Sequence, residues 1–283
     1  MRDLIPNPAS LITRFAPAPT GYLHLGHVLN AVYVWDIARA SGPGARVLLR
    51  IEDHDRTRCR PEFEAALLED LAWLGFAADG ELTRQSARGA FYERALGDLR
   101  ARGLTYACDC SRADIASSRY PGTCRERNLR ESAGAGVRVK LDSTVARFDD
   151  LRLGPQEQRP SEQCGDLLAR DRHGNWTYQF AVVVDDRLQN VNLVIRGEDL
   201  LDSTGRQIQL ARLVGREQPP AFLHHALLMK TATQKLSKSD GDTGVRDLRA
   251  KGWSAEAVID RATSLAGLSR DDVQFRTRMT RRP

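Results

Sequence analysis

The stretch RFAPAPTGYLHLGH, residues 14–27, decides the fold that we expect for this chain. A short apolar run precedes it, and a helix-like run over residues 28–40 follows it. This order of a strand, a loop with proline and glycine, and a helix start is typical of a phosphate site. The N–H groups at the start of the helix then face the anion. Gly26 lacks a Cβ, so backbone or ligand can approach it closely. His24 and His27, three residues apart, share one side of a helix.

The totals describe a globular chain with one large domain or two ordinary ones. It has 283 residues, of which 41% are hydrophobic and 28% charged, and these values exclude wholesale disorder. The net charge of +5 is a mild basic excess. This excess suits a polyanionic partner but does not demand one.

Two further features bear on the cellular compartment. The first ten residues contain no signal-peptide core, and no apolar run approaches membrane-spanning length. Five cysteines are an odd count without a framework spacing, which favours reduced thiols or a metal site over disulfides. We therefore expect a cytoplasmic monomer that does not associate with membranes.

Apolar patterns predict alternating strands and helices. Residues 46–51 read as a buried strand ending before Glu52, and the helix between it and the first strand makes a βαβ unit with a parallel sheet. Further helices are expected over residues 61–74, 91–101, 206–213 and 254–265. Residues 137–141 and 146–153 read as strands of a smaller insertion, and the main sheet is expected to resume at 166–170, 191–195 and 222–229.

Two short motifs in this order resemble the class I aminoacyl-tRNA synthetases: HLGH near the amino end and KLSKS at residues 235–239. The longer stretches RFAPAPTGYLHLGH, LLRIEDHDRTR, YQFAVVVDD and VIRGEDLLDSTGRQIQL resemble the glutamate-specific branch. The resemblance implies an α/β fold with the Rossmann-like (HUP-type) parallel sheet of class I synthetases. It also implies a small zinc-bearing insertion and a short C-terminal stem-contact region.

The chain ends at Pro283, soon after KLSKS, whereas glutamyl-tRNA synthetases continue into a long helical anticodon-binding part. In this respect the chain resembles the glutamyl-queuosine tRNA(Asp) synthetase family. That family activates L-glutamate with ATP in the absence of tRNA, then attaches it to the queuosine base at the wobble position of tRNA(Asp). The expected parts are residues 1–107 and 166–230 as the two halves of the catalytic domain, 108–165 as the zinc-bearing insertion, and 231–283 as the KLSKS loop with a short helical region, without an anticodon-binding domain.

The resemblance implies an ATP site that joins the two motifs. His24, Gly26 and His27 would contact the phosphates, and Lys235 and Lys238 would close over them. Charge builds on phosphate oxygens during activation, so positioned donors and cations are the groups that the reaction needs. Mg²⁺ would accompany ATP, without assigned protein ligands. Taken singly, the motifs could be a surface histidine pair and a solvated lysine loop.

The resemblance also implies a glutamate site. Its residues are Arg14, Phe15, Ala16, Pro17, Ala18, Glu52, Tyr178 and Arg196. Arg14 and Arg196 would bind the two carboxylates, because guanidinium groups match carboxylate geometry. Glu52 would take the ammonium group, and Tyr178 would add a hydroxyl contact. Singly, the arginines could serve structural ion pairs and the tyrosine could belong to the core.

Two positions depart from the family pattern. The family commonly has a hydroxyl residue at the position of Ala18, and its queuosine branch often has serine at that of His27. Two alternatives to the queuosine ligase stay open. One is a truncated glutamyl-tRNA synthetase that charges the 3′ end of its tRNA, and the other is a non-catalytic paralogue that binds RNA or senses glutamate.

A metal site is expected in the insertion, where the pattern C-x-C followed by Y-x₃-C resembles the zinc site of the family. Its ligands would be Cys108, Cys110, Tyr120 and Cys124. Three thiolates and a phenolate can complete a tetrahedron around one structural Zn²⁺ per chain, which would support an insertion too small for a core of its own. Free thiols without metal are the alternative. Cys59 and Cys164 read as ordinary thiols.

Overall fold

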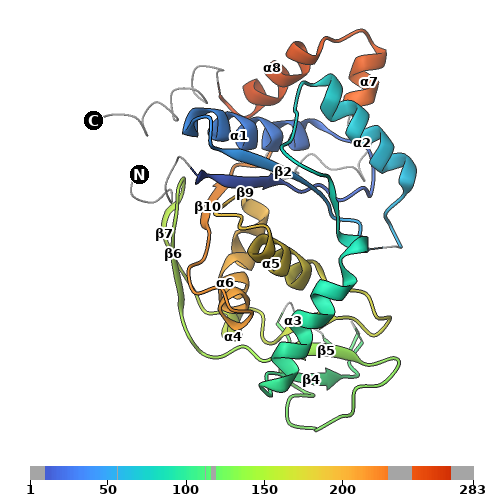
Figure 1. Cartoon of the computed structure of the whole chain (residues 1–283), viewed down its shortest axis with the longest axis vertical. Coiled ribbons are helices and arrows are strands. Elements are labelled where there is room, and N and C mark those ends of the chain that lie inside the picture. The colour runs from blue at the N-terminus through green and yellow to red at the C-terminus, as the bar shows by residue number, and fades with distance from the viewer. Residues whose placement is uncertain (1–9, 56, 112, 116–118, 229–243, 269–283) are drawn as a thin grey trace.

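The computed structural model describes residues 10–55, 57–111, 113–115, 119–228 and 244–268. Its centre is a sheet of mostly parallel strands that helices cover on both faces (Figure 1). Lys235 and Lys238 lie outside the described residues. The predicted α/β class with a parallel sheet is confirmed.

The parallel strands form two runs that meet in the middle of the molecule. They are β1 (Ile12–Phe15), β2 (Arg46–Ile51) and β3 (Thr83–Arg84), and then β9 (Leu193–Gly197), β10 (Ala221–His225) and β6 (Ala146–Asp150), with β7 (Gly154–Gln158) antiparallel at the edge. At the junction the Asn192 N–H donates to the Ile12 carbonyl at 2.9 Å. From β1 the chain proceeds outward to β2, and from β9 it proceeds to β10 in the other direction. The carboxyl ends of β1 and β9 therefore flank the switch point, where open α/β sheets bind ligands.

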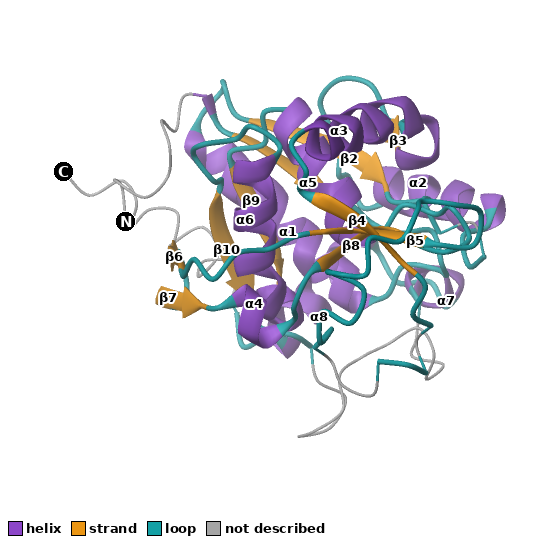
Figure 2. Cartoon of the chain, turned by 90° about the horizontal axis from the view of Figure 1, so that it is seen from below, coloured by secondary structure: helices purple, strands orange, loops and turns teal. Residues whose placement is uncertain are grey.

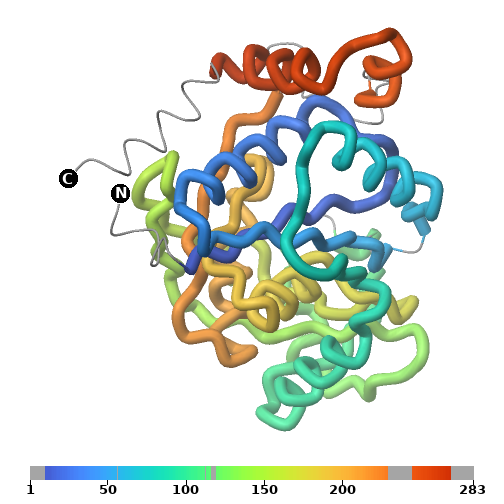
Figure 3. Tube along the Cα trace, turned by 45° about the horizontal axis from the view of Figure 1, so that its top comes forward, coloured from blue at the N-terminus to red at the C-terminus, as the bar shows by residue number. Residues whose placement is uncertain are grey.

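Helices pack against both faces of the sheet. They include α1 (Leu25–Ser41), α5 (Tyr178–Leu188), α6 (Thr204–Leu213) and, packed on α1, α8 (Ala255–Leu265). Helices α1 and α8 lie on one face, and Figure 3 shows α8 beside α1 despite their separation in sequence. Val258 and Ala262, four residues apart on α8, join the apolar core that α1 forms with the sheet. On the other face Ile208 of α6 packs with Val194 and Phe222.

A second, antiparallel sheet lies at the other end of the molecule. It consists of β4 (Thr105–Cys108), β5 (Gly136–Val139) and β8 (Leu167–Arg170), which lie together in Figure 2. The strand predicted at 166–170 exists, but its expected place in the main sheet is wrong, since β8 pairs with β5. The prediction that residues 146–153 belong to the insertion is likewise wrong. β6 pairs with β10 in the main sheet, where Leu151 N–H also donates to the Phe222 carbonyl at 2.8 Å. Local sequence patterns do not identify such distant partners.

The remaining elements connect these layers. They are α2 (Pro61–Trp73), α3 (Gly89–Ala101), α4 (Pro160–Gln163), α7 (Val245–Ala250) and the 3₁₀ turns η3 (Gln85–Ala87) and η4 (Glu198–Ser203). The predicted helices at 61–74, 91–101, 206–213 and 254–265 are thereby confirmed to within a few residues. Among the described residues, no helix combines the length and apolarity that a membrane span requires.

Two glycines with the same backbone angle provide a test of packing between β8 and the cysteine-bearing segment. Gly165 and Gly103 both have φ of +68°. A Cβ on Gly165 would lie 2.1 Å from the Tyr120 carbonyl oxygen, whereas a Cβ on Gly103 would meet nothing within 4 Å. We expect Gly103→Ala to lower the free energy of unfolding by about 1–2 kcal/mol, the ordinary cost of a left-handed residue. Gly165→Ala should cost about 1–3 kcal/mol more from the clash, measured by urea denaturation.

Equal losses in the two variants would contradict the close approach of Tyr120 to Gly165. The comparison is matched, because both substitutions add the same methyl group at the same φ.

Candidate active site

A cavity of about 390 Å³ opens at the carboxyl ends of β1 and β9. The predicted site residues that line it are Arg14, Ala16, Ala18, His24, Gly26, His27, Glu52, Tyr178 and Arg196. They come from both halves of the sequence and meet at the point where the strand order reverses. The cavity is thus where a doubly wound sheet is expected to bind its ligands.

Two predicted residues in the described part of the chain, Phe15 and Pro17, do not line this cavity. The Phe15 side chain is buried in the main apolar core. Pro17 acts through its carbonyl, which accepts the N–H of Glu52 at 3.0 Å and so fixes the loop after β1 beside the end of β2. Lys235 and Lys238 lie outside the described residues.

Two histidines stand at the amino end of α1. Nδ1 of His24 accepts the Gly26 N–H at 3.1 Å, and Nδ1 of His27 accepts the His24 N–H at 3.2 Å. Since both Nδ1 atoms accept, each neutral ring carries its proton on Nε2 and can donate from there. A Cβ on Gly26 would lie 2.9 Å from the His24 ring, so the close neighbour of this glycine is His24 itself. Two ring donors beside a helix N-terminus suit an anionic phosphate.

A buried ion-pair network supports the floor of the cavity. Arg14 donates from Nε to Asp186 at 3.2 Å and from Nη1 to the Ile195 carbonyl at 3.3 Å. Arg50 is completely buried and donates from Nη1 to the same Asp186 oxygen at 2.7 Å. Asp186 of α5 therefore holds arginines from β1 and β2 together. Burial alone raises the pKa of Asp186, but the charges of Arg14 and Arg50 lower it further than burial raises it.

Glu52 is less well compensated than Asp186. Its carboxylate is buried and lies 3.4 Å from Arg50, whose other partners are Asp186 at 2.7 Å and Asp185 at 3.9 Å. Burial raises the pKa of Glu52, and the opposing charges of Arg50 and Arg14 do not cancel this effect. In the free protein, a further cation near Glu52 would therefore stabilise its ionised carboxylate. An ammonium group of a ligand is such a cation.

Arg196 presents the opposite case. It donates from Nε to His224 at 3.0 Å, from Nη1 to Gln207 at 2.7 Å and from Nη2 to Thr204 at 2.8 Å. Among the described residues no carboxylate forms an ion pair with it, and burial lowers its pKa. A carboxylate ligand would supply the missing charge. Beside it, burial raises the pKa of the Tyr178 hydroxyl, so this group stays protonated and can donate.

Four residues behind the cavity were not predicted from the sequence. These are Arg50, Asp185, Asp186 and His224. A signal for Arg50 was available, since it is the one charge inside the apolar run VLLRI, residues 47–51. The two aspartates likewise follow directly on the apolar run AVVV. A charge within an apolar segment is rarely buried unless it is paired, so these residues could have been predicted to meet.

A second cavity of about 610 Å³ adjoins the first, because Tyr178 lines both. Its basic and aromatic lining residues are His54, Arg58, Arg138, Arg172, His173 and Trp176. Cys108 and Cys110 also line it, so this cavity extends from the main sheet to the insertion.

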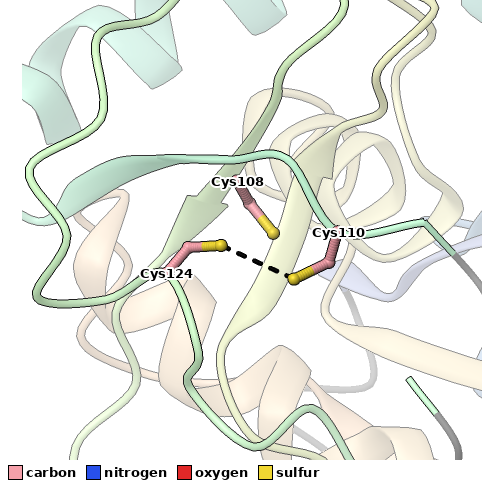
Figure 4. Close-up of side chains that lie close together, drawn as sticks. All are labelled: Cys108, Cys110 and Cys124. Atoms are coloured by element: carbon pink, nitrogen blue, oxygen red, sulfur yellow. Dashed lines mark hydrogen bonds between the residues drawn. The ribbon is translucent and has the colours of Figure 1, made fainter. Parts of the chain in front are cut away.

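The three cysteines of the predicted metal site lie together, as Figure 4 shows. The sulfur atoms of Cys108, Cys110 and Cys124 are all within 4.8 Å of one another, with Cys110 and Cys124 3.5 Å apart. Sulfur atoms around a tetrahedral zinc are about 3.8 Å apart, as follows from a Zn–S distance of about 2.3 Å. The donor set therefore fits a metal ion. Cys59 and Cys164 do not belong to this cluster, as predicted.

Tyr120 lies beside the cluster. Its hydroxyl is 3.5 Å from the Cys108 sulfur and accepts the Cys124 N–H at 2.9 Å. Burial and the Cys108 contact raise its pKa, so without a metal it is a phenol. Burial also raises the pKa of the Cys110 thiol, to about 12. For Cys108 the burial effect is outweighed by hydrogen bonds from Tyr120 and Arg138, and its pKa is lowered.

The doubly wound sheet and the paired histidines at the switch point suit an enzyme that binds a nucleotide. Residues 10–278 match the sequence model of the family described as tRNA synthetases class I (E and Q), catalytic domain. A solved structure of a glutamate tRNA ligase from Elizabethkingia meningosepticum CCUG26117, in complex with its amino acid, is similar with a TM-score of 0.77 and 26% identity. The similarity covers 89% of this chain and 60% of that chain.

Similar proteins of known name narrow the class I synthetases to one family. A Glutamyl-Q tRNA(Asp) synthetase of Rhodobacter capsulatus is 39% identical over 271 residues, covering 86% of this chain and 96% of the relative. One of Symbiobacterium thermophilum is 42% identical over 286 aligned positions, covering 91% and 87%. The chain belongs to the glutamyl-queuosine tRNA(Asp) synthetase family of class I synthetases, and it is an enzyme of the ligase type.

The electrostatics of Glu52 predict an effect on stability. A carboxyl group with a raised pKa binds more protons in the folded than in the unfolded state. The wild-type free energy of unfolding therefore falls as pH rises from about 4.3, the unfolded pKa of glutamate, through the folded pKa. Glu52→Gln removes this loss, and Arg50 keeps Asp185 and Asp186 as partners. We expect the variant to be equally stable at pH 4 and about 0.5–2 kcal/mol more stable at pH 8.

Glu69→Gln is the matched control, because Glu69 forms an exposed pair with Arg249 at 2.8 Å. Its effect should stay below about 1 kcal/mol, since exposed ion pairs contribute little. A Glu52→Gln protein that loses stability at pH 8 would show that the buried carboxylate is well compensated in the free enzyme.

Proposed function

We propose that the protein activates L-glutamate with ATP and then transfers the glutamyl group to queuosine in tRNA(Asp). The observation that carries the first half is the charge pattern of the cavity. Two arginines, Arg14 and Arg196, and one incompletely compensated carboxylate, Glu52, line the same space. L-Glutamate has two carboxylates and one ammonium group, which is the complementary set.

Activation would proceed at the junction of the amino-acid residues and the start of α1. A glutamate carboxylate oxygen attacks the α-phosphorus of ATP, the bond to the β-phosphate oxygen breaks, and glutamyl-adenylate and pyrophosphate form. His24 and His27 would donate to phosphate oxygens, while Lys235 and Lys238 stay predicted cations outside the described residues. Mg²⁺ would accompany ATP. The protein would supply position and charge rather than a covalent nucleophile.

We assign the acceptor nucleoside to the second cavity. It adjoins the first at Tyr178, so a nucleophile held there would lie beside the glutamyl carbonyl carbon. Attack at that carbon breaks the bond to AMP and completes the transfer. Basic side chains such as Arg58 and Arg172 suit the neighbouring phosphates of an RNA loop. These substrates are cytoplasmic, which supports a cytoplasmic location, and we retain the expectation of a monomer.

The function is tested by isotope exchange between ATP and pyrophosphate. We expect exchange that depends on L-glutamate and needs no tRNA, with aspartate and glutamine inactive. Glu52→Gln should lower kcat/KM for glutamate about 100-fold, because a charge-assisted contact to the ammonium group is lost. Absence of glutamate-dependent exchange in the wild type would favour a non-catalytic paralogue.

Transfer is tested with labelled glutamate and three RNAs. We expect label on tRNA(Asp) that carries queuosine, and none on unmodified tRNA(Asp) or on tRNA(Glu). Charging of tRNA(Glu) alone would instead identify a truncated glutamyl-tRNA synthetase, and the queuosine proposal would be wrong.

We also propose that one structural Zn²⁺ is held by Cys108, Cys110, Cys124 and Tyr120. The three sulfur atoms and the adjacent hydroxyl support this assignment. The ion would join β4 to the segment around Cys124, where the local apolar cluster is small.

The zinc proposal predicts about one zinc per wild-type chain by elemental analysis, and less than about 0.2 in Cys110→Ser. Cys164→Ser is the matched control, because this thiol lies outside the cluster and donates to the Pro160 carbonyl. It should keep its zinc. Equal zinc contents in Cys110→Ser and the wild type would show that the proposed zinc site is wrong.

A further inference from the structure

Arg196 has a buried histidine behind it. His224 of β10 has no exposed surface and lies between β6 and β9. Its Nδ1 is 2.7 Å from Asp150 Oδ2, and its Nε2 accepts from Arg196 Nε at 3.0 Å. The chain of contacts from Asp150 to Arg196 thus crosses three neighbouring strands and ends at the first cavity.

The chemistry of the two partners fixes the proton on His224. A guanidinium group has donors and no acceptor, so Nε2 of His224 must present its lone pair to Arg196. Nδ1 then carries the ring proton and donates it to the Asp150 carboxylate. Protonated His224 would place an N–H against the Arg196 N–H, and this hydrogen bond would be lost.

We propose that Asp150 and His224 position Arg196 for the substrate carboxylate, and that protonation of His224 releases Arg196 from this position. The proposal rests on the proposed function, in which Arg196 binds glutamate. His224 does not line the first cavity and reaches it through Arg196, so it is a positioning residue. Gln207 and Thr204 hold the two terminal nitrogens of Arg196, which leaves Nε, and with it the tilt of the guanidinium plane, to His224.

Charged and titratable neighbours set the pH at which this occurs. Those near the His224 ring are Asp150, Arg152, Arg196 and His225, together with Glu198, which pairs with Arg152. Burial lowers the pKa of His224, Asp150 raises it, and the arginine charges lower it further. The net pKa lies below the usual value, so the neutral ring persists through neutral pH. Glutamate affinity should fall only as pH drops below about 6.5.

Three variants test the proposal by exchange kinetics. His224→Phe keeps a flat ring but removes the acceptor, and Asp150 retains backbone donors from Arg152 at 3.0 Å and Leu153 at 2.9 Å. We expect the KM for glutamate at pH 8 to rise about 10-fold or more, with the KM for ATP within about 2-fold of wild type. His224→Gln restores an uncharged acceptor. It should bring the KM for glutamate back to within about 3-fold of wild type and abolish its rise below pH 6.5.

Asp150→Asn tests the proton position itself. Oδ1 of Asp150 accepts the N–H groups of Arg152 and Leu153, whereas Oδ2 accepts only that of His224 closely, at 3.1 Å, so the amide nitrogen would take the place of Oδ2 beside the ring. It would donate to Nδ1 and force the ring proton onto Nε2, facing Arg196. The KM for glutamate should therefore rise as in His224→Phe.

The outcomes separate this proposal from the proposed function. Without glutamate-dependent exchange in the wild type, the proposed function itself fails. With exchange present, an unchanged glutamate KM in folded His224→Phe overturns the positioning role. If the KM for glutamate still rises at acid pH in His224→Gln, protonation of His224 is not what releases Arg196. The rise would then be assigned to another group, such as Glu52. Melting curves of each variant establish that the protein is folded.

Discussion

The hydrogen bond between Arg50 and Asp186 is the interaction on which the site depends. Burying the Arg50 guanidinium completely is costly, and the Asp186 carboxylate offsets this cost with a hydrogen bond of 2.7 Å. Because the same carboxylate oxygen also binds Arg14, the contact joins β1 and β2 to α5. The two halves of the sequence that flank the insertion are therefore locked together beneath the cavity. Replacing Asp186 would leave Arg14 with no carboxylate partner among the described residues, so the network constrains the fold and the site at once.

The remaining charges follow a simple division. The negative charge of Asp186 is balanced by two arginines. Glu52 pairs with one arginine, which also pairs with Asp186, and Arg196 has only uncharged hydrogen-bond partners. The free site thus retains one carboxylate and one guanidinium whose charges await a ligand. Each is costly in a dry interior and each is positioned before the ligand arrives. This pair matches the ammonium group and one carboxylate of an amino acid, and Arg14, which already pairs with Asp186, is the further guanidinium in the cavity that a second carboxylate of the proposed substrate would meet.

Several site residues could be predicted from the sequence, whereas the placement of one strand and of His224 could not. Arg14, Glu52, Tyr178 and Arg196 were found through the stretches that carry the family resemblance, and the structure brings all four into one cavity. The placement of β6 in the main sheet could not be found, because it depends on parallel pairing with β10, far along the chain. His224 was missed because a histidine in an apolar strand gives no local sign of its partners.

The network also bears on the order of events in the proposed reaction. Arg14 is held by Asp186 and Ile195, and Arg196 by His224, Gln207 and Thr204, all within the chain itself. Neither arginine needs RNA to reach its position, so the entropy of ordering them is lost on folding rather than on binding. In a site built in this way, both arginines are in position for an amino acid before any nucleic acid arrives. The buried partners of the two arginines are therefore the physical basis on which we propose activation without tRNA.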